Sequence, residues 1–326
     1  MPDPALTGAT VQGVVLQGTG GVWKVRDAAG VVRDASLRGR LKQAEGEGEG
    51  DAAAAGEGEW RKLAVGDEVR LERDVRGGAW AIAEILPRRS RLARRAPGGA
   101  YGERVVAANV DQVVVVFAAA EPAPHRRLLD RFLVVASAND IPARIVINKM
   151  DLAPPDVAAR FADYPRAGYP VHHTSVARRE GLDALHEVLR GRVSALTGPS
   201  GVGKSSLLNA MYPGLDLRVG AISRAVGKGR HTTVGASMHP LPDGGYVMDT
   251  PGLREVGMWN LDPRALDRCF PEMRDALGRC RFRDCRHRAE PGCAVREAVL
   301  AGTVSAERYD SYLRLLDELE EGAAAW

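Results

Sequence analysis

The sequence has little cysteine, few aromatic residues, almost no net charge and no long apolar run. Its 326 residues include 4 cysteines, and three of these sit within fourteen residues beside a histidine, which favours a metal site over disulfides. No uninterrupted apolar run approaches the roughly 20 residues that a membrane-spanning helix requires. A basic-then-apolar leader is also missing from residues 1–12. We therefore expect a cytoplasmic protein without a membrane partner.

The apolar share of 45% and the charged share of 27% are typical of a globular protein and identify no activity. The formal net charge is only +3, but acids and bases are segregated along the chain. Residues 44–60 carry six acids and no base, whereas five arginines lie within residues 88–95. Local basic patches are therefore stronger than the total charge suggests.

Residues 10–86 have the pattern of a small β-barrel. Short segments of alternating or β-branched character, separated by glycine-rich turns, predict strands at 10–16, 22–26, 68–72 and 80–85. The acidic stretch 44–60 has no apolar periodicity, so we interpret it as a flexible insertion in a barrel loop.

From residue 111 the pattern changes to strands that alternate with helices. Apolar runs predict buried strands at 113–117, 143–148, 169–174 and 193–197, with helices at 126–136, 157–161 and 182–189. This alternation predicts a parallel α/β sheet covered by helices. Beyond Gly252 the chain is rich in arginine and cysteine, and it closes with a helical stretch near 305–320.

Residues 198–205 read Gly-Pro-Ser-Gly-Val-Gly-Lys-Ser and fit the phosphate-loop (P-loop) pattern. An apolar strand precedes them and a helix-forming run, 206–211, follows, which argues against a chance glycine-rich turn. Backbone N–H groups of such a loop turn toward phosphates, Lys204 would bridge the β- and γ-phosphates, and Ser205 would ligate Mg²⁺. The expected GTP-binding residues here are Gly198, Pro199, Ser200, Gly201, Val202, Gly203, Lys204, Ser205 and Ser206.

A second candidate phosphate element, Asp249-Thr-Pro-Gly252, follows the apolar run 246–248. Asp249 would hold Mg²⁺ through water, and the Gly252 N–H would sense the γ-phosphate of GTP. By itself this tetrapeptide is more often a turn. Together with the phosphate loop it predicts a nucleotide switch.

The segment Asn148-Lys149-Met-Asp151 ends a predicted strand, which places its side chains at the sheet edge where ligands of open α/β folds bind. An ionised Asp151 accepts from guanine N1–H and from the exocyclic amino group, whereas adenine presents an acceptor at N1 and no amino group at that edge. Polar mismatch in a buried site discriminates by about 10⁴ or more, so this carboxylate selects GTP over ATP. Ser175 and Val176 follow the next strand and would donate backbone N–H groups to guanine O6.

These base-reading elements precede the phosphate loop, whereas ordinary GTPases place the phosphate loop first. The order indicates a circular permutation, which keeps the sheet and the pocket and moves the chain ends. The Asp249 switch then leads directly into the cysteine region. Our hypothesis is that the γ-phosphate biases the position of that region.

Cys280-x4-Cys285-x-His287-x5-Cys293 supplies three thiolates and one imidazole, a closed tetrahedral set for one structural Zn²⁺. Unrelated buried cysteines are the alternative. Arginines interleave with these four residues, however, and are poor material for an apolar core. We interpret the fourth cysteine, Cys269, as a buried structural thiol.

Taken together, the motifs resemble a known family, the ribosome small-subunit-dependent GTPases of bacteria. The resemblance covers nearly the whole chain and rests on Gly39-Arg-Leu, Val65-Gly-Asp-Glu-Val, Pro87-Arg-Arg-Ser-Arg-Leu, Asn148-Lys-Met-Asp, the phosphate loop, Gly229-Arg-His-Thr-Thr, Asp249-Thr-Pro-Gly-Leu and the Cys/His cluster, in that order. It implies a multidomain protein: an OB-fold at 1–96, a circularly permuted GTPase domain at 97–260, and a zinc-binding helical domain at 261–326. It also implies GTP and GDP as ligands, the small ribosomal subunit and its rRNA as partners, and late maturation of that subunit as the role. We expect a monomer.

Two departures from the family pattern affect the site. The family usually has three threonines after the histidine, whereas this chain has His231-Thr232-Thr233-Val234, which leaves the Mg²⁺ ligand open between Thr232 and Thr233. The acidic stretch 44–60 also lies outside the usual pattern.

Leu253 stands where many GTPases have the glutamine that positions the attacking water. His231 is the candidate replacement, because imidazole can hydrogen-bond water near neutral pH. A surface histidine that contacts ribosomal RNA is the equal alternative. Slow intrinsic hydrolysis is expected, because groups supplied by a partner accelerate related GTPases by ~10³ to 10⁵.

Two other functions use the same motifs. In the first, a GTP-gated RNA-binding checkpoint or chaperone, hydrolysis serves only release. In the second, an ATP-dependent phosphotransferase, the protein would bind ATP as well as GTP, which Asp151 disfavours.

Overall fold

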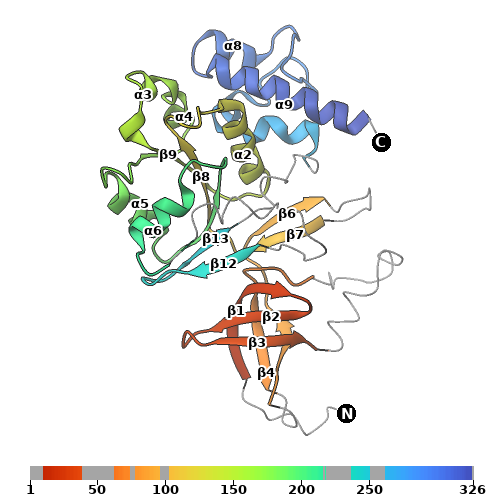
Figure 1. Cartoon of the computed structure of the whole chain (residues 1–326). Coiled ribbons are helices and arrows are strands. Elements are labelled where there is room, and N and C mark those ends of the chain that lie inside the picture. Colours follow the sequence, from red (N-terminus) through yellow and green to blue (C-terminus); the bar gives the residue numbers. More distant parts are fainter. Residues whose placement is uncertain are drawn as a thin grey trace, which may run out of the picture.

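The computed structural model describes residues 10–38, 62–73, 78–95, 103–215, 217, 236–249 and 261–324. Within them the chain forms a barrel, a helix-covered sheet and a helical tail, with barrel and tail at opposite ends of the sheet domain (Figure 1). The acidic stretch 44–60, His231, Thr232, Thr233, Gly252 and Leu253 lie outside the described residues, as does the side chain of Asp249.

The amino-terminal region is a closed five-stranded barrel in the order β1-β2-β3-β5-β4, which confirms the predicted small barrel. Its strands are β1 (Thr10–Thr19), β2 (Val22–Asp27), β3 (Val32–Leu37), β4 (Glu68–Arg73) and β5 (Trp80–Ile85). Alternate residues point inward, so Val15, Val25, Val69, Leu71 and Ile82 form a fully buried core. Among the barrel strands, β3 was not predicted; only Ala35 and Leu37 of its six residues are buried.

A hairpin connects the barrel to the sheet. Strands β6 (Arg91–Arg95) and β7 (Glu103–Ala108) pair antiparallel, and they lie on either side of the predicted 96/97 domain boundary. Buried Asp67 accepts two hydrogen bonds from Arg88, at 2.7 and 2.8 Å, beside the bridge between Val65 and Ala107. The first arginine of the basic run therefore anchors the barrel to the hairpin.

The central sheet has the order β10-β9-β8-β11-β13-β12 and is parallel except for β12. Its strands are β8 (Gln112–Ala118), β9 (Ala143–Asn148), β10 (Val171–His173), β11 (Val193–Thr197), β12 (Ser237–Pro240) and β13 (Tyr246–Asp249). Helices α2 (Arg126–Ala138), α3 (Val157–Arg160), α4 (Asp163–Arg166), α5 (Leu182–Leu189) and α6 (Lys204–Met211) cover it. Two separate apolar cores, one against α2 and one against α5 and α6, show that both faces are buried. The predicted α/β architecture is confirmed.

The tail packs on the α2 face of the sheet domain. It consists of the 3₁₀ turns η3 (Pro263–Cys269) and η4 (Pro271–Ala276) and the helices α8 (Ala294–Leu300) and α9 (Ala306–Ala324). Arg308 of α9 is fully buried and bonds to Asp130 of α2 and to Glu272 of η4. Among the helices described here, none combines the length and apolarity needed to cross a bilayer.

Candidate nucleotide site and metal centre

The carboxyl ends of β8, β9, β10 and β11 meet at one edge of the sheet, because these strands are parallel. The base-reading segment follows β9, and the phosphate loop follows β11. A hydrogen bond joins the two elements directly: Nδ2 of buried Asn148 donates to the Val202 carbonyl at 2.8 Å. Segments 54 residues apart in sequence therefore lie together at one sheet edge.

Two glycines of the loop 198–203 meet close contacts that exclude a side chain. Gly198 has φ +136°, and a Cβ there would lie 2.0 Å from the carbonyl oxygen of Val116. Gly203 has φ +94°, and a Cβ there would lie 2.4 Å from Nδ2 of Asn148. These are left-handed conformations in which only glycine fits without strain. The loop therefore packs directly against the sheet edge, with Gly198 on the Val116 carbonyl and Gly203 on the Asn148 side-chain amide.

Lys204 begins helix α6 and is only 5% exposed. Its ammonium donates to the carbonyls of Gly198 and Pro199, at 2.9 and 2.7 Å, and so lies across the mouth of the loop. Ser205, also buried, and Ser206 follow on the first turn of α6. Backbone N–H groups at a helix start and a buried cation together form a strongly anion-attracting environment.

At the base end, Ser175 contributes through its side chain. Its hydroxyl donates to Oδ1 of Asp151 at 2.6 Å, and this hydrogen bond is the largest cause that lowers the pKa of the Asp151 carboxyl. Thr174 donates its hydroxyl to Oδ1 of Asn148 at 3.1 Å, and Lys149, with φ +60°, donates to the Glu121 carbonyl. The carboxylate is thus held ionised in a fixed orientation.

We expected the N–H groups of both Ser175 and Val176 to be available to guanine O6, but one of them already has a partner in the protein. Thr174 N–H donates to the Ile147 carbonyl and Ser175 N–H to the Glu180 carbonyl. Within the described part of the chain, Val176 N–H has no such partner. Val176 therefore has the amide that remains for a ligand. The sequence pattern could not show which of the two amides, Ser175 or Val176, is free for a ligand. The Ser175 amide is used by the turn that brings Glu180 back beside it.

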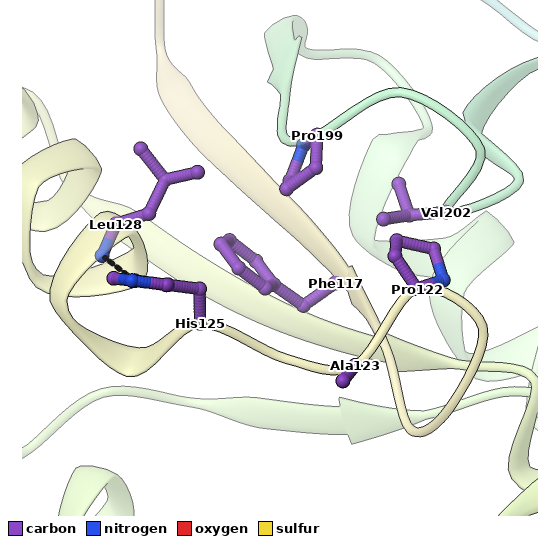
Figure 2. Close-up of a pocket in the computed structure, with 7 residues that line it drawn as sticks. All are labelled: Phe117, Pro122, Ala123, His125, Leu128, Pro199 and Val202. Atoms are coloured by element: carbon purple, nitrogen blue, oxygen red, sulfur yellow. Dashed lines mark hydrogen bonds between the residues drawn. The ribbon is translucent and has the colours of Figure 1, made fainter.

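An apolar cavity of about 310 Å³ lies between the phosphate loop and the start of α2 (Figure 2). Its lining residues are Phe117, Pro122, Ala123, His125, Leu128, Pro199 and Val202. The ring of His125 caps α2 by accepting from the Leu128 N–H at 3.3 Å, which leaves the walls almost wholly apolar. The cavity suits an apolar group and not a phosphate, so we separate it from the nucleotide site.

The predicted switch begins beside the phosphate loop. Strand β13 pairs with β11 so that Asp249 lies opposite Leu196, next to the strand that leads into the loop. The backbone of Asp249 is therefore at the same sheet edge as the other elements.

Cys280, Cys285, His287 and Cys293 place their ligand atoms within 4.8 Å of one another, so the cluster can hold a metal ion. Nδ1 of His287 lies 3.6 Å from Sγ of Cys280 and 3.4 Å from Sγ of Cys293, and these two sulfurs are 4.0 Å apart. Sulfur ligands of a tetrahedral ion about 2.3 Å away are about 3.8 Å apart, which is close to these spacings.

Surrounding groups orient the cluster. Oδ2 of Asp267 lies 3.4 Å from Nε2 of His287, and the Tyr309 hydroxyl donates to the His287 carbonyl. Such carboxylate–histidine pairs fix the ligand tautomer. Asp267 was not among the predicted site residues, because nothing in its local sequence marks it. Cys269 stays outside the cluster: it is buried, bonds to the Ala265 carbonyl, and burial raises the pKa of its thiol to about 11.

Comparison with known proteins agrees with this geometry. The RsgA GTPase family model matches residues 85–259. A Gemmatimonas aurantiaca protein described as small ribosomal subunit biogenesis GTPase RsgA is 61% identical over 94% of this chain and 97% of its own length. A Moorella thermoacetica protein of the same description is 40% identical over 95% of this chain and 97% of its own.

Two solved structures share the fold. YjeQ from Thermotoga maritima superposes with a TM-score of 0.76 at 32% identity, covering 95% of this chain and 99% of that one. YloQ, described as a circularly permuted GTPase, gives a TM-score of 0.71 at 29% identity, covering 96% of each chain. Both likenesses span barrel, sheet domain and tail.

Proposed function

This chain belongs to the RsgA GTPase family, and from that premise we propose how its residues perform the family's reaction. The protein is a GTPase, a hydrolase acting on GTP, in the biogenesis of the small ribosomal subunit. The observation that carries our assignment of the site is the Asn148–Val202 hydrogen bond, which couples the base-reading and phosphate-binding segments. The remaining contacts suggest a role for each group.

The nucleotide would lie across the sheet edge. Residues 198–206 surround the phosphates, with Lys204 neutralising their charge. Asp151 accepts from guanine, oriented by Ser175, while Lys149 and Asn148 support the base segment and Val176 N–H donates to guanine O6. Ser205, Asp249 and one of Thr232 and Thr233 would hold Mg²⁺, which would supply positive charge to stabilise the phosphates during hydrolysis.

Hydrolysis needs a water that attacks the γ-phosphorus as the bond to the bridging β-γ oxygen breaks. We propose that His231 orients this water or accepts its proton, since Leu253 has no group to do so. The small subunit would complete the site, which makes intrinsic hydrolysis slow. His231→Ala should then abolish most of the subunit-stimulated rate, and an unchanged rate assigns His231 to RNA contact instead.

Zn²⁺ fits the Cys280, Cys285, His287 and Cys293 donor set, because thiolate and imidazole are its preferred ligands and the four atoms are close to tetrahedral spacing. It would fix the loops of the tail. The barrel and the tail, at opposite ends of the GTPase domain, would then both contact rRNA. Assembly of ribosomal subunits implies a cytoplasmic location, and we propose that the protein acts as a monomer.

The test is GTP hydrolysis with and without purified small subunits at several salt concentrations. We expect strong stimulation that falls as salt rises, because phosphate contacts are screened. Lys204→Ala should lose hydrolysis in both conditions. Absence of stimulation in the unaltered protein would overturn the assignment to the subunit, and a stimulated single-turnover rate without multiple turnover would favour the checkpoint function.

A further inference from the structure

The tail has a short loop that begins just before Cys280 and ends just before Cys285, two of the proposed metal ligands. Residues 279–284 of this loop read Arg-Cys-Arg-Phe-Arg-Asp, which gives three bases, one acid and one aromatic ring. Phe282 is 42% exposed, and no other aromatic residue is among the large exposed apolar side chains of the described segments. A phenylalanine so placed contributes nothing to a core. We call residues 279–284 the Arg-Phe loop.

The loop is held firmly at its base. Arg281 N–H donates to the Gly292 carbonyl at 2.9 Å, and Cys285 N–H donates to the Phe282 carbonyl at 3.4 Å. Gly292, with φ +70°, lies against the Arg281 side chain, where a Cβ would be 3.1 Å from the arginine Cβ. Cys280 and Cys285 attach the loop to the metal cluster. The ring therefore projects from a preorganised turn.

The arginines of the tail fall into two groups. Arg286 bonds to Glu320, and Arg288 bonds to Asp317 and Glu320, so both attach the cluster region to α9. Across the described ranges, by contrast, no carboxylate lies within 4.0 Å of a guanidinium of Arg279, Arg281 or Arg283. All three of these arginines are exposed. Their charge is available to a partner.

Arg281 and Phe282 also contact each other. The guanidinium carbon of Arg281 lies 5.6 Å from the Phe282 ring centroid, which is cation–π distance. A flat ring beside a flat cation, with two further cations adjacent, matches a nucleotide, whose base stacks while its phosphates pair with arginine. A base inside a duplex is already stacked on both sides and cannot be reached in this way.

We propose that the Arg-Phe loop binds an unpaired nucleotide of RNA, with Phe282 stacked on the base and Arg279, Arg281 and Arg283 on the neighbouring phosphates. The proposal rests on the proposed function, because the RNA would belong to the small subunit. It distinguishes this loop from Arg286 and Arg288, which keep the tail in shape. Phe282 would then act through stacking and the three arginines through charge.

The experiment measures the affinity of the full zinc-loaded chain for small subunits, with a non-hydrolysable GTP analogue, at several salt concentrations. We expect Phe282→Leu to weaken binding about 5-fold or more with an unchanged salt dependence, because stacking is uncharged. Phe282→Tyr should restore it. The triple variant Arg279→Gln, Arg281→Gln, Arg283→Gln should weaken binding and lower the slope of log K against log salt by about 2. Arg314→Gln, which changes an exposed α9 arginine paired with Asp310, removes one positive charge elsewhere in the tail and should change neither quantity.

Each outcome has one meaning. If Phe282→Leu binds like the unaltered chain, or if Phe282→Tyr fails to rescue, stacking is refuted. If the triple variant keeps its salt slope, the charge contact is refuted. Repeating the assay on protein-free rRNA should reproduce both losses; losses seen only with whole subunits would assign the loop to an acidic protein and overturn the RNA proposal. Failure of the unaltered chain to bind subunits at all would refute the proposed function instead.

Discussion

Replacing Arg308 with methionine should destabilise the attachment of the tail by an amount that depends on pH. Arg308 is fully buried and donates at 2.6 Å both to Oδ1 of Asp130 and to Oε1 of Glu272. Burial opposes its charge, but attraction to these carboxylates outweighs burial and raises the pKa of Arg308. Methionine of similar length would leave two carboxylates, 1% and 5% exposed, without their cation.

Breaking a buried ion pair by removing one partner costs roughly 3–5 kcal/mol, and we expect about that cost at pH 8. The hydroxyl of Tyr164 donates to Asp130 at 2.9 Å, which lowers this cost but does not remove it. Without Arg308 the folded state favours protonated carboxylates, so it binds more protons than the unfolded state. Stability then rises as pH falls, and the cost at pH 5 should be smaller than at pH 8.

Hydrogen exchange of the α9 amides, followed by mass spectrometry at the two pH values, measures the opening free energy directly. The triple variant Arg308→Met, Asp130→Asn, Glu272→Gln removes all three charges and should recover much of the loss. Arg314→Gln on the same helix is the control and should stay within about 0.5 kcal/mol, because its pair with Asp310 is exposed. A cost for Arg308→Met that is below about 1 kcal/mol, or equal at both pH values, would refute the reasoning.

Three further outcomes follow from the site. Asp151→Asn should lower GTP affinity about 10²-fold or more by titration calorimetry, because the carboxylate that Ser175 orients is replaced by an amide; an unchanged affinity would remove Asp151 from the base site. Gly198→Ala should abolish nucleotide binding through its 2.0 Å clash with a strand carbonyl, whereas Gly201→Ala, with no neighbour closer than 3.8 Å, should lose only about 1–2 kcal/mol of stability to its φ of +79°; equal effects would argue against the loop geometry. Elemental analysis should find that Cys293→Ser loses bound zinc and that Cys269→Ser retains it. Metal loss in both variants would mean that the assigned set of metal ligands is wrong.

The sequence alone determined the parts that depend on local chemistry. Local chemistry explains the glycines at fixed spacing before Lys204, the carboxylate of Asp151, and the three thiols and one imidazole within residues 280–293. Apolar periodicity likewise predicted the barrel, the sheet and α9, because burial on one or both faces leaves a regular pattern. The order of these motifs was enough to indicate the circular permutation.

Tertiary structure decided which of those groups are available and which are already bonded. Only the fold shows that the amide of Ser175 belongs to Glu180 while its hydroxyl orients Asp151, and that Arg88 anchors the barrel. It also separates paired Arg286 and Arg288 from the exposed Arg-Phe loop, which share one sequence pattern. A hydrogen bond or an ion pair depends on a partner brought from elsewhere in the chain, and residue type and spacing do not specify that partner.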